Sequence, residues 1–340
     1  MRTGHTTTPP VRLPAHVPLV LLERAGITEG VHHGSVVVLD PAGDVVHAAG
    51  DIDAAIYPRS ALKPVQAAGM VRAGLPLEGE LLALAASSHS GEPRHLAGAR
   101  RILELGGFGE DALRNVPDLP YGPDAREQWL REGHGPSRIA QNCSGKHAAM
   151  LLTARGRGWS TADYPDPEHP LQRALAAEVE RLTGAPVAAV TADGCGAPLF
   201  ATSLRGLARA AAALVTGAPG TPERRVADAM RAHPGMVAGA GRDVTALMEA
   251  VPGLLAKDGF EGVQIAALPD GHAVAVKIAA GTDRARMPAT AAALLRCGID
   301  SAVLEPFAEA PVYGGTRVVG RLRAATGEEQ LSRVASLHRA

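Results

Sequence analysis

The pattern of hydrophobic and polar positions gives the chain strand-like ends and a helical middle. Short apolar runs at 19–22 and 35–39 are typical of strands, and a turn at 41–44 joins the second run to 45–48 as a β-hairpin. The last third returns to this pattern and predicts strands over 263–267, 273–279 and 312–322.

The region between these strands is mainly helical in its spacing. From 60 to about 105 the clearest helical pieces are 81–86 and 95–105, and 106–135 is rich in Gly, Pro and charge, as loops around short helices are. Further helices are predicted over 145–154, 169–182, 200–215, 222–232, 244–250 and about 283–297. Strands at both ends around a helical middle predict an α+β fold, with one antiparallel sheet built from both chain ends and helices packed around it.

The domain organisation follows from the same pattern. Residues 1–16 are polar and Pro-rich, which predicts a mobile N-terminal arm. We predict a single two-lobed domain over 17–340, because 340 residues are enough for one large core and no internal repeat is visible.

Composition narrows the classes of function. The chain is 46% hydrophobic and 20% charged, with a formal net charge of -1, so it offers no electrostatic argument for binding nucleic acid or an anionic membrane. Aromatic residues make up only 3%, too few for platforms that stack single-stranded bases. We expect a small-molecule substrate, no nucleic acid and no membrane.

The cysteines and the N-terminus point to the cytoplasm. Cys143, Cys195 and Cys297 are too few and too widely spaced for a secreted disulfide framework. The first residues contain no apolar segment of a secretory signal. In a reducing compartment a cysteine is more often a ligand or a nucleophile than half of a disulfide; Cys297, near a predicted helix end, is interpreted as structural.

Ser60 and Lys63 form the first candidate catalytic pair. Residues three apart share one face of a helix, so the Lys63 amine can reach the Ser60 hydroxyl and activate it once its own pKa is lowered. Such spacing is common by chance, but here the lysine lies in a mostly apolar run. Since Pro64 disfavours helix in the residue before it, we expect a strained or newly begun helix at Lys63.

Two further segments admit both a structural and a functional interpretation. Ser88 and His89 follow the apolar run 81–86, and a helix-ending turn with positive φ at Gly91 explains the segment fully. Lys277 shares a strand face with alanines, which fits either a solvated position or the wall of a cleft.

Cys143 and Cys195 are candidate metal ligands or nucleophiles. Cys143 opens the predicted helix 145–154, where the helix N-terminus should lower its pKa, and Cys195 lies in a loop between Gly194 and Gly196. Burial as two small residues is the alternative, but both stand among polar and Gly residues rather than in apolar runs.

Taken in order, these segments resemble the asparaginase II family, the Rhizobium-type (class 3) L-asparaginases. The resemblance runs from about residue 17 to the C-terminus and rests on Arg-Ser-x-x-Lys-Pro-x-Gln at 59–66, Ser-His-Ser-Gly-Glu at 88–92, Asn-Cys-Ser-Gly-Lys-His at 142–147, Asp-Gly-Cys-Gly-x-Pro at 193–198 and Val-Lys-Ile at 276–278. It implies a fold similar to serine β-lactamases and glutaminases, hydrolysis of L-asparagine to L-aspartate and ammonia, and a homodimer.

The resemblance also implies roles for individual residues. It pairs Ser60 with Lys63 and Ser88 with Lys277 as catalytic residues. It implies zinc as the cofactor, with Cys143, Lys146 and Cys195 as its ligands; by general chemistry His147 would be a better third ligand than a lysine and is the alternative. We predict as substrate-binding residues Arg59, His89, Asn142 and Asp193.

Other functions compete with this one. A glutaminase or another small-amide hydrolase is the nearest, because one methylene is worth only ~1–3 kcal/mol in a pocket. A penicillin-recognising serine hydrolase shares the S-x-x-K…Ser…Lys order, but such enzymes work outside the cytoplasm. A non-catalytic amino-acid or zinc sensor is disfavoured because both serines and both lysines are present.

Overall fold

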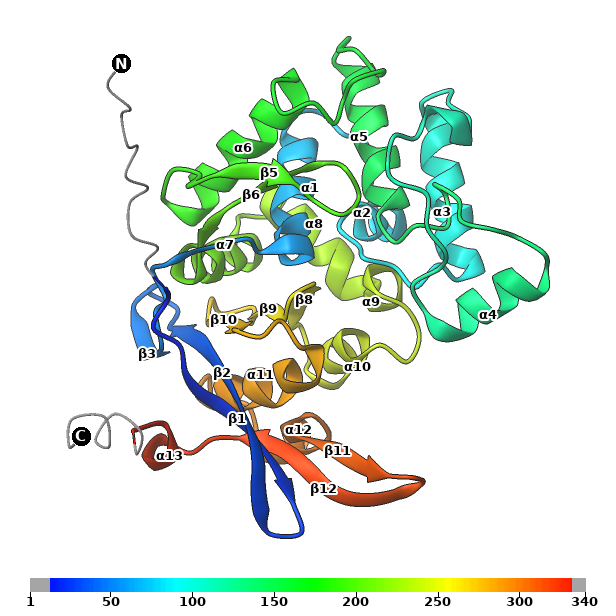
Figure 1. Ribbon diagram of the computed structural model, residues 1–340. Helices are drawn as coiled ribbons and strands as arrows, with labels where there is room; N and C mark the ends of the chain where they lie inside the picture. Colours follow the sequence, from blue (N-terminus) through cyan, green and yellow to red (C-terminus); the bar gives the residue numbers. More distant parts are fainter. Residues whose placement is uncertain (1–12, 332–340) are drawn as a thin grey trace, which may run out of the picture.

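Both ends of the chain contribute strands to one antiparallel sheet in the computed structural model, which describes residues 13–331 (Figure 1). The strands lie in the order β11-β12-β1-β2-β10-β9-β8, with β3 also paired to β2. Their bounds are β1 Val17–Arg24, β2 Ile27–Leu39, β3 Val45–Ala49, β8 Leu255–Gly259, β9 Val263–Ala267, β10 Ala273–Ile278, β11 Glu309–Gly314 and β12 Arg317–Ala324. The predicted α+β class and the sheet built from both chain ends are confirmed.

The register shows how the two ends meet. β1 lies between β2 and β12, so that Leu22 is opposite both Gly30 and Leu322. β2 is long enough to pair with β1 over its first half and with β3 and β10 over its second. The predicted hairpin at 35–48 is confirmed, with Val37 opposite Ala48. The strand β8 ends the sheet order.

Helices cover both faces of this sheet and form a larger body beside it (Figure 1). α7 packs against β2, β9 and β10, and α11 packs against the same strands and β12. The bounds are α1 Lys63–Arg72, α2 Gly79–Ala85, α3 Pro93–Leu105, α4 Pro123–Arg131, α5 Ser144–Gly156, α6 Pro170–Thr183, α7 Leu204–Thr216, α8 Pro222–Ala232, α9 Pro234–Val237, α10 Asp243–Ala250, α11 Arg286–Leu295, α12 Ser301–Ala308 and α13 Gly327–Leu331, with 3-10 turns η1 Arg59–Leu62, η2 Glu110–Ala112 and η3 Asp283–Ala285.

Local sequence explains α7, which packs against the sheet and against the helices α6 and α8. Ser203 caps α7 by accepting a hydrogen bond from the Gly206 N–H. Leu207, Ala211 and Leu214 follow at helical spacing and are completely buried, so one face of α7 is apolar and packs on the sheet. Removal of this apolar area from water stabilises the contact by ~25 cal/mol per Å².

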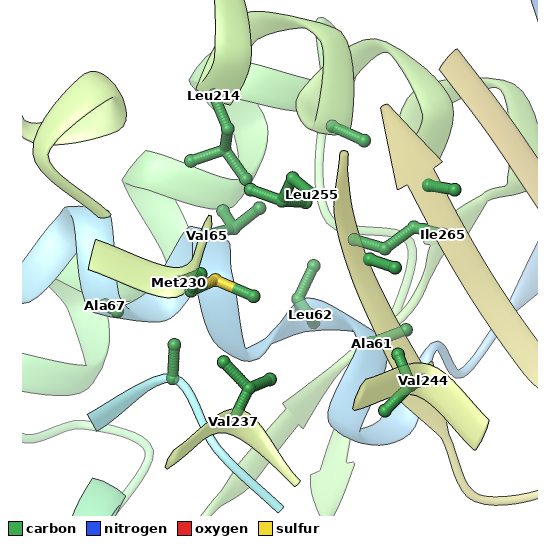
Figure 2. Close-up of a cluster of buried hydrophobic side chains, with 14 of the residues drawn as sticks. Ala61, Leu62, Val65, Ala67, Leu214, Met230, Val237, Val244, Leu255 and Ile265 are labelled. Carbon is green, nitrogen blue, oxygen red and sulfur yellow. The ribbon is translucent and has the colours of Figure 1, made fainter. Parts of the chain in front are cut away.

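The core extends to the segment that carries Ser60. Figure 2 shows Ala61 and Leu62 of η1 and Val65 of α1 among buried side chains from the sheet and from other helices. Leu255 of β8 and Ile265 of β9 lie in the same cluster, and all these residues are completely buried. The polar residues Ser60 and Lys63 are therefore held by apolar neighbours on both sides.

Several predicted elements differ from the structure. The strand predicted over 312–322 is a hairpin, β11 and β12, because the chain turns at Gly314–Gly315 with Gly315 at a φ of 63°. The helix predicted from 200 begins at Leu204, since Pro198–Phe200 forms β6 and pairs with β5, Val190–Ala192. The sequence pattern missed β8, α12 and the small pair β4 Ala55–Ile56 and β7 Thr202–Ser203.

Residues 1–12 of the predicted N-terminal arm lie outside the described residues, and the division of the chain at 16/17 stays a prediction. Within 13–331, no helix combines the length and the apolar composition that crossing a membrane requires.

Candidate active site

Ser60 lies on a strained turn that precedes a helix. Arg59 has a φ of 54°, which is uncommon for a residue with a side chain and is often found at functional sites. η1 then passes into α1, which begins at Lys63 with Pro64 in its first turn, where a missing N–H costs nothing. This confirms the expected newly begun helix. Ala61 and Leu62 point into the core, and Ser60 lines a small cavity.

Lys63 connects three segments of the chain. Its side chain is buried, and its Nζ donates to the Ser88 Oγ at 2.9 Å, to the Ser87 carbonyl at 2.6 Å and to the Cys143 Sγ at 3.1 Å. Among the described residues, Lys63 therefore bonds the hydroxyl of Ser88 and not that of Ser60, while the two serines line the same cavity.

The segment that carries Ser88 is fixed by its backbone. The Ser88 N–H donates to the Val237 carbonyl at 3.0 Å and the His89 N–H to the Asn142 carbonyl at 3.1 Å. Gly91 has a φ of 83°, as the turn interpretation predicted. Asn142 lines the same cavity as the two serines. The segment Ser88-His89 is therefore held between the end of α9 and the residues before α5.

Two predicted site residues, Lys277 and His89, contact groups other than the two serines of the cavity. The Lys277 Nζ donates to the backbone carbonyls of Glu261 and Ile278, at 2.7 and 2.6 Å, and not to Ser88, so the predicted pairing of Ser88 with Lys277 is not formed. His89 is completely buried and bonds the Ser144 Oγ through its Nε2 at 2.9 Å, and its role in substrate binding stays a prediction.

Lys257 is a second buried lysine, directly before two residues of the cavity wall. It was not among the predicted site residues. It is completely buried on β8 and bonds the backbone carbonyl and carboxylate of Asp258. Burial and the charge of Lys63 lower the pKa of Lys257 to about 8, although Asp258 opposes the shift. A signal was present: a lysine directly after the apolar run 254–256.

Gly259 explains how β8 comes so close to Ser60. A Cβ at position 259 would lie 2.4 Å from the Pro58 carbonyl oxygen and 3.0 Å from the Ala61 nitrogen. Only glycine permits this approach of two backbones. The end of β8, which carries Lys257 and Asp258, therefore packs directly on η1.

The three predicted zinc ligands lie together. Cys143 caps α5, Cys195 follows β5, and both are buried. The Lys146 Nζ donates to the Cys195 Sγ at 3.3 Å. A hydrogen bond from Cys143, together with Lys146, lowers the pKa of Cys195 well below its ordinary value, whereas the same bond and burial raise the pKa of Cys143.

The donor set fits zinc on one condition. Within the described part of the chain, no three His, Cys, Asp or Glu side chains are arranged to hold a metal, and the alternative ligand His147 bonds the Tyr164 hydroxyl at 2.8 Å. If zinc binds beside the two cysteines, the Lys146 amine would be its third protein ligand. Burial acts to lower the pKa of Lys146, but the two cysteines and Asp193 outweigh it and raise the pKa, so zinc would have to displace a proton.

Asp193 and Arg59 form an ion pair beside the cysteines. The Arg59 Nε donates to the Asp193 Oδ1 at 2.8 Å, and the guanidinium lies over the Phe260 ring, 5.3 Å from its centre. Burial acts to raise the pKa of Asp193, but Lys146, the Gly194 N–H and Arg59 outweigh it and lower the pKa. The carboxylate is thus ionised between two cations.

The chain belongs to the L-asparaginase II family, whose sequence model matches residues 20–324, nearly the whole chain. This confirms the resemblance drawn from the motifs and indicates a hydrolase that acts on amides. No sequence among the curated proteins matches the chain.

The solved structures to which the chain is similar include three different proteins. A structure described as Mglu in its native form is 19% identical, with a TM-score of 0.37, and the match covers 77% of this chain and 63% of that one. A β-lactamase from Mycobacterium bovis is 16% identical, with a TM-score of 0.42 and coverage of 81% and 94%. EstCE1, a hydrolase with promiscuous acyltransferase activity, is 15% identical, with a TM-score of 0.38 and coverage of 72% and 88%. Likenesses this weak carry no argument about function.

Proposed function

We propose that the chain is an L-asparaginase that hydrolyses the side-chain amide of L-asparagine to L-aspartate and ammonia. Membership of the L-asparaginase II family supports the reaction, and the observation that carries the mechanism is the contact between the Lys63 Nζ and the Ser88 Oγ beside Ser60. A serine needs a neighbouring base to become a nucleophile, and this lysine is the group in position.

The reaction would proceed in two steps. The oxygen of Ser60 or Ser88 attacks the amide carbon while a lysine accepts the serine proton, and the C–N bond breaks as that proton passes to the leaving ammonia. Water then cleaves the acyl-enzyme ester and releases L-aspartate. Direct contact with Lys63 favours Ser88 as the attacking serine, and Lys257 takes the place that the motif comparison gave to Lys277.

Zinc, held by Cys143, Lys146 and Cys195, would supply a fixed positive charge that orients the substrate. Arg59, Asn142 and Asp193 lie around this position and at the cavity, where they would help bind the substrate. The homodimer and the cytoplasmic location stay predictions.

Ammonia release from L-asparagine and L-glutamine tests the proposal, with Ser87→Ala as a matched control for Ser88→Ala. Both serines are buried neighbours, but the Ser87 Oγ has no hydrogen-bond partner, and the backbone carbonyl that Lys63 contacts is kept in the variant. We expect Ser88→Ala and Lys63→Met to lower kcat by at least ~10²-fold and Ser87→Ala to leave it nearly unchanged.

The same assay separates the alternatives. Turnover of L-glutamine at an equal rate would indicate a broader amidohydrolase, and release from neither amide would refute the proposal. Intact-mass analysis of rapidly quenched enzyme should show one added aspartyl group in the wild type, and its loss in Ser60→Ala or in Ser88→Ala identifies the serine that carries it.

A further inference from the structure

The cavity that holds the two serines is too small for a substrate as it stands. Its volume is about 30 Å³, roughly the space of one or two water molecules. A second cavity of about 440 Å³ lies next to it, lined by the loops at Ser90, Gly122 and Gly241. Arg242 lines both cavities, so its side chain forms part of the wall between them.

Arg242 is positioned by groups on three sides. Its Nη2 donates to the Asp258 Oδ2 at 2.6 Å, and its Nη1 lies 3.4 Å from the Ser88 carbonyl oxygen. The Tyr121 ring stacks on the guanidinium, 4.7 Å from ring centre to Cζ. The guanidinium is thereby held at the edge of the cavity, and within residues 13–331 its Nε makes no hydrogen bond and its Nη1 only a long one.

The charges that line the small cavity are unevenly balanced. Among the described residues of its wall, Arg242 carries the single positive charge and Asp258 and Asp283 carry negative charges. Asp258 is already matched by Lys257 and Arg242. Asp283 makes one ion pair, with the Arg286 Nε at 3.6 Å, which is beyond hydrogen-bond distance.

The Asp283 side chain is about half exposed, at 49%, so a second cation can approach its carboxylate. Burial, together with the nearby Asp258 and Asp243, raises the pKa of Asp283, although Arg286 and Arg242 oppose the shift. An ammonium group beside this carboxylate would stabilise its charged form. A guanidinium with unused donors and an under-compensated carboxylate thus lie on the wall of one cavity that also contains both serines.

We propose that Arg242 and Asp283 together bind the main-chain end of the substrate, with Arg242 on the α-carboxylate and Asp283 on the α-ammonium. The two residues restrict the substrate class to free α-amino acids that carry a side-chain amide. A planar guanidinium suits a carboxylate because two N–H groups can donate in parallel. This inference rests on the proposed function and deepens it.

Binding of the product and of two truncated analogues tests this assignment directly. L-aspartate has both charged groups, β-alanine lacks the α-carboxylate and succinate lacks the amine. Calorimetry should show Arg242→Gln weakening L-aspartate by at least ~30-fold, to about the level of β-alanine on the wild type, with β-alanine itself unchanged. Asp283→Asn should weaken L-aspartate to about the level of succinate and leave succinate unchanged.

Two further variants act as controls. Arg242→Lys keeps the charge but loses the planar pair of donors, so its loss should be smaller than that of Arg242→Gln. Asp124→Asn removes an exposed carboxylate of the neighbouring cavity and should change neither the binding of L-aspartate nor kcat/KM for L-asparagine.

The outcomes are distinguishable. If Arg242→Gln weakens all three ligands equally, Arg242 only supports the cavity wall, and the assignment is overturned. It is also overturned if the wild type hydrolyses L-asparagine but both variants bind L-aspartate normally. If the three ligands bind with the predicted pattern but the wild type releases no ammonia, the assignment of Arg242 and Asp283 stands and the proposed hydrolysis fails.

Discussion

At the scale of single residues, the site depends on two buried lysines that differ in their surroundings. Lys63 donates to a carbonyl, a hydroxyl and a thiol, so its three ammonium hydrogens are all used. Lys257 instead lies against one carboxylate, that of Asp258, in a fully buried position. Burial disfavours a charged lysine, and the like charge of Lys63 adds to this effect. The neutral form of Lys257 is therefore accessible near neutral pH.

The pH dependence of activity tests this difference. With a pKa of about 8, Lys257 is mostly protonated at pH 7 and mostly neutral at pH 9. If neutral Lys257 acts as a base, kcat/KM for L-asparagine should rise about tenfold between these pH values and then level. Lys257→Arg cannot lose its proton in this range and should show low activity without the rise. A wild-type profile that is flat from pH 7 to pH 9 would contradict the assignment.

The same shift affects stability with a definite sign. The pKa of Lys257 is lower in the folded protein than the ~10.4 of an exposed lysine, so between these values the unfolded chain binds more protons. This residue therefore makes the free energy of unfolding rise with pH from about 8 to ~10.4. The cost of burying the charged lysine is fully present below that range.

At the scale of elements, the close contact of β8 with η1 places Lys257 and Ser60 on neighbouring segments. The contact depends on Gly259, because a Cβ there would overlap the Pro58 carbonyl. Gly259→Ala should force the two segments apart, lower the free energy of unfolding by ~1–3 kcal/mol and reduce kcat. Urea denaturation and ammonia release measure the two effects.

Gly156→Ala is a suitable control for this substitution. Gly156 is the last residue of α5, and a Cβ there would meet nothing within 4 Å. Alanine at that position should be neutral or stabilise by up to ~1 kcal/mol, since it favours helix. Equal stability of Gly259→Ala and the wild type would show that β8 does not need this approach.

The elements also explain which parts of the site could be predicted from sequence. Ser60, Lys63 and Cys143 stand at helix starts, where local sequence is unusual, and the structure places them as expected at such starts. Lys257 and Lys277 both lie on strands beside apolar residues, and local pattern does not separate them. The difference is one of sheet order: β8 ends the order and contacts η1, whereas β10 lies between β2 and β9.

Arg242 and Asp283 were missed for a similar reason. Each lies at the start of a helical segment far along the chain from Ser60, where the local sequence is typical of an ordinary helix N-terminus. Arg242 makes long-range contacts to Ser88, Tyr121 and Asp258, and Asp283 shares the cavity wall with all four residues; no local pattern contains these relations.

At the scale of the whole molecule, the site lies where distant parts of the chain meet. Ser60 comes from η1, Cys143 from the start of α5, Cys195 from the loop after β5 and Lys257 from the sheet. The general α+β class followed from the strand-like ends and helical middle, since each pattern is local. The meeting of these four segments follows from tertiary packing, which one sequence without its fold does not specify.

Zinc binding should therefore act on the stability of the whole fold, because Cys143 and Cys195 join α5 to the β5–β6 loop. A ligand that binds only the folded state stabilises it by about 2.7 kcal/mol when its free concentration is 100 times its dissociation constant. Added zinc should thus raise the Tm of the wild type, and a chelator should reverse the effect. Cys143→Ser should abolish the shift, whereas Cys297→Ser, at a cysteine beyond the end of α11, should keep it.

An equal shift in both variants would place the metal elsewhere, and no shift in the wild type would show that two thiols and an amine do not suffice. If zinc raises the Tm while its removal leaves kcat and KM for L-asparagine unchanged, the metal stabilises the fold and has no part in orienting the substrate.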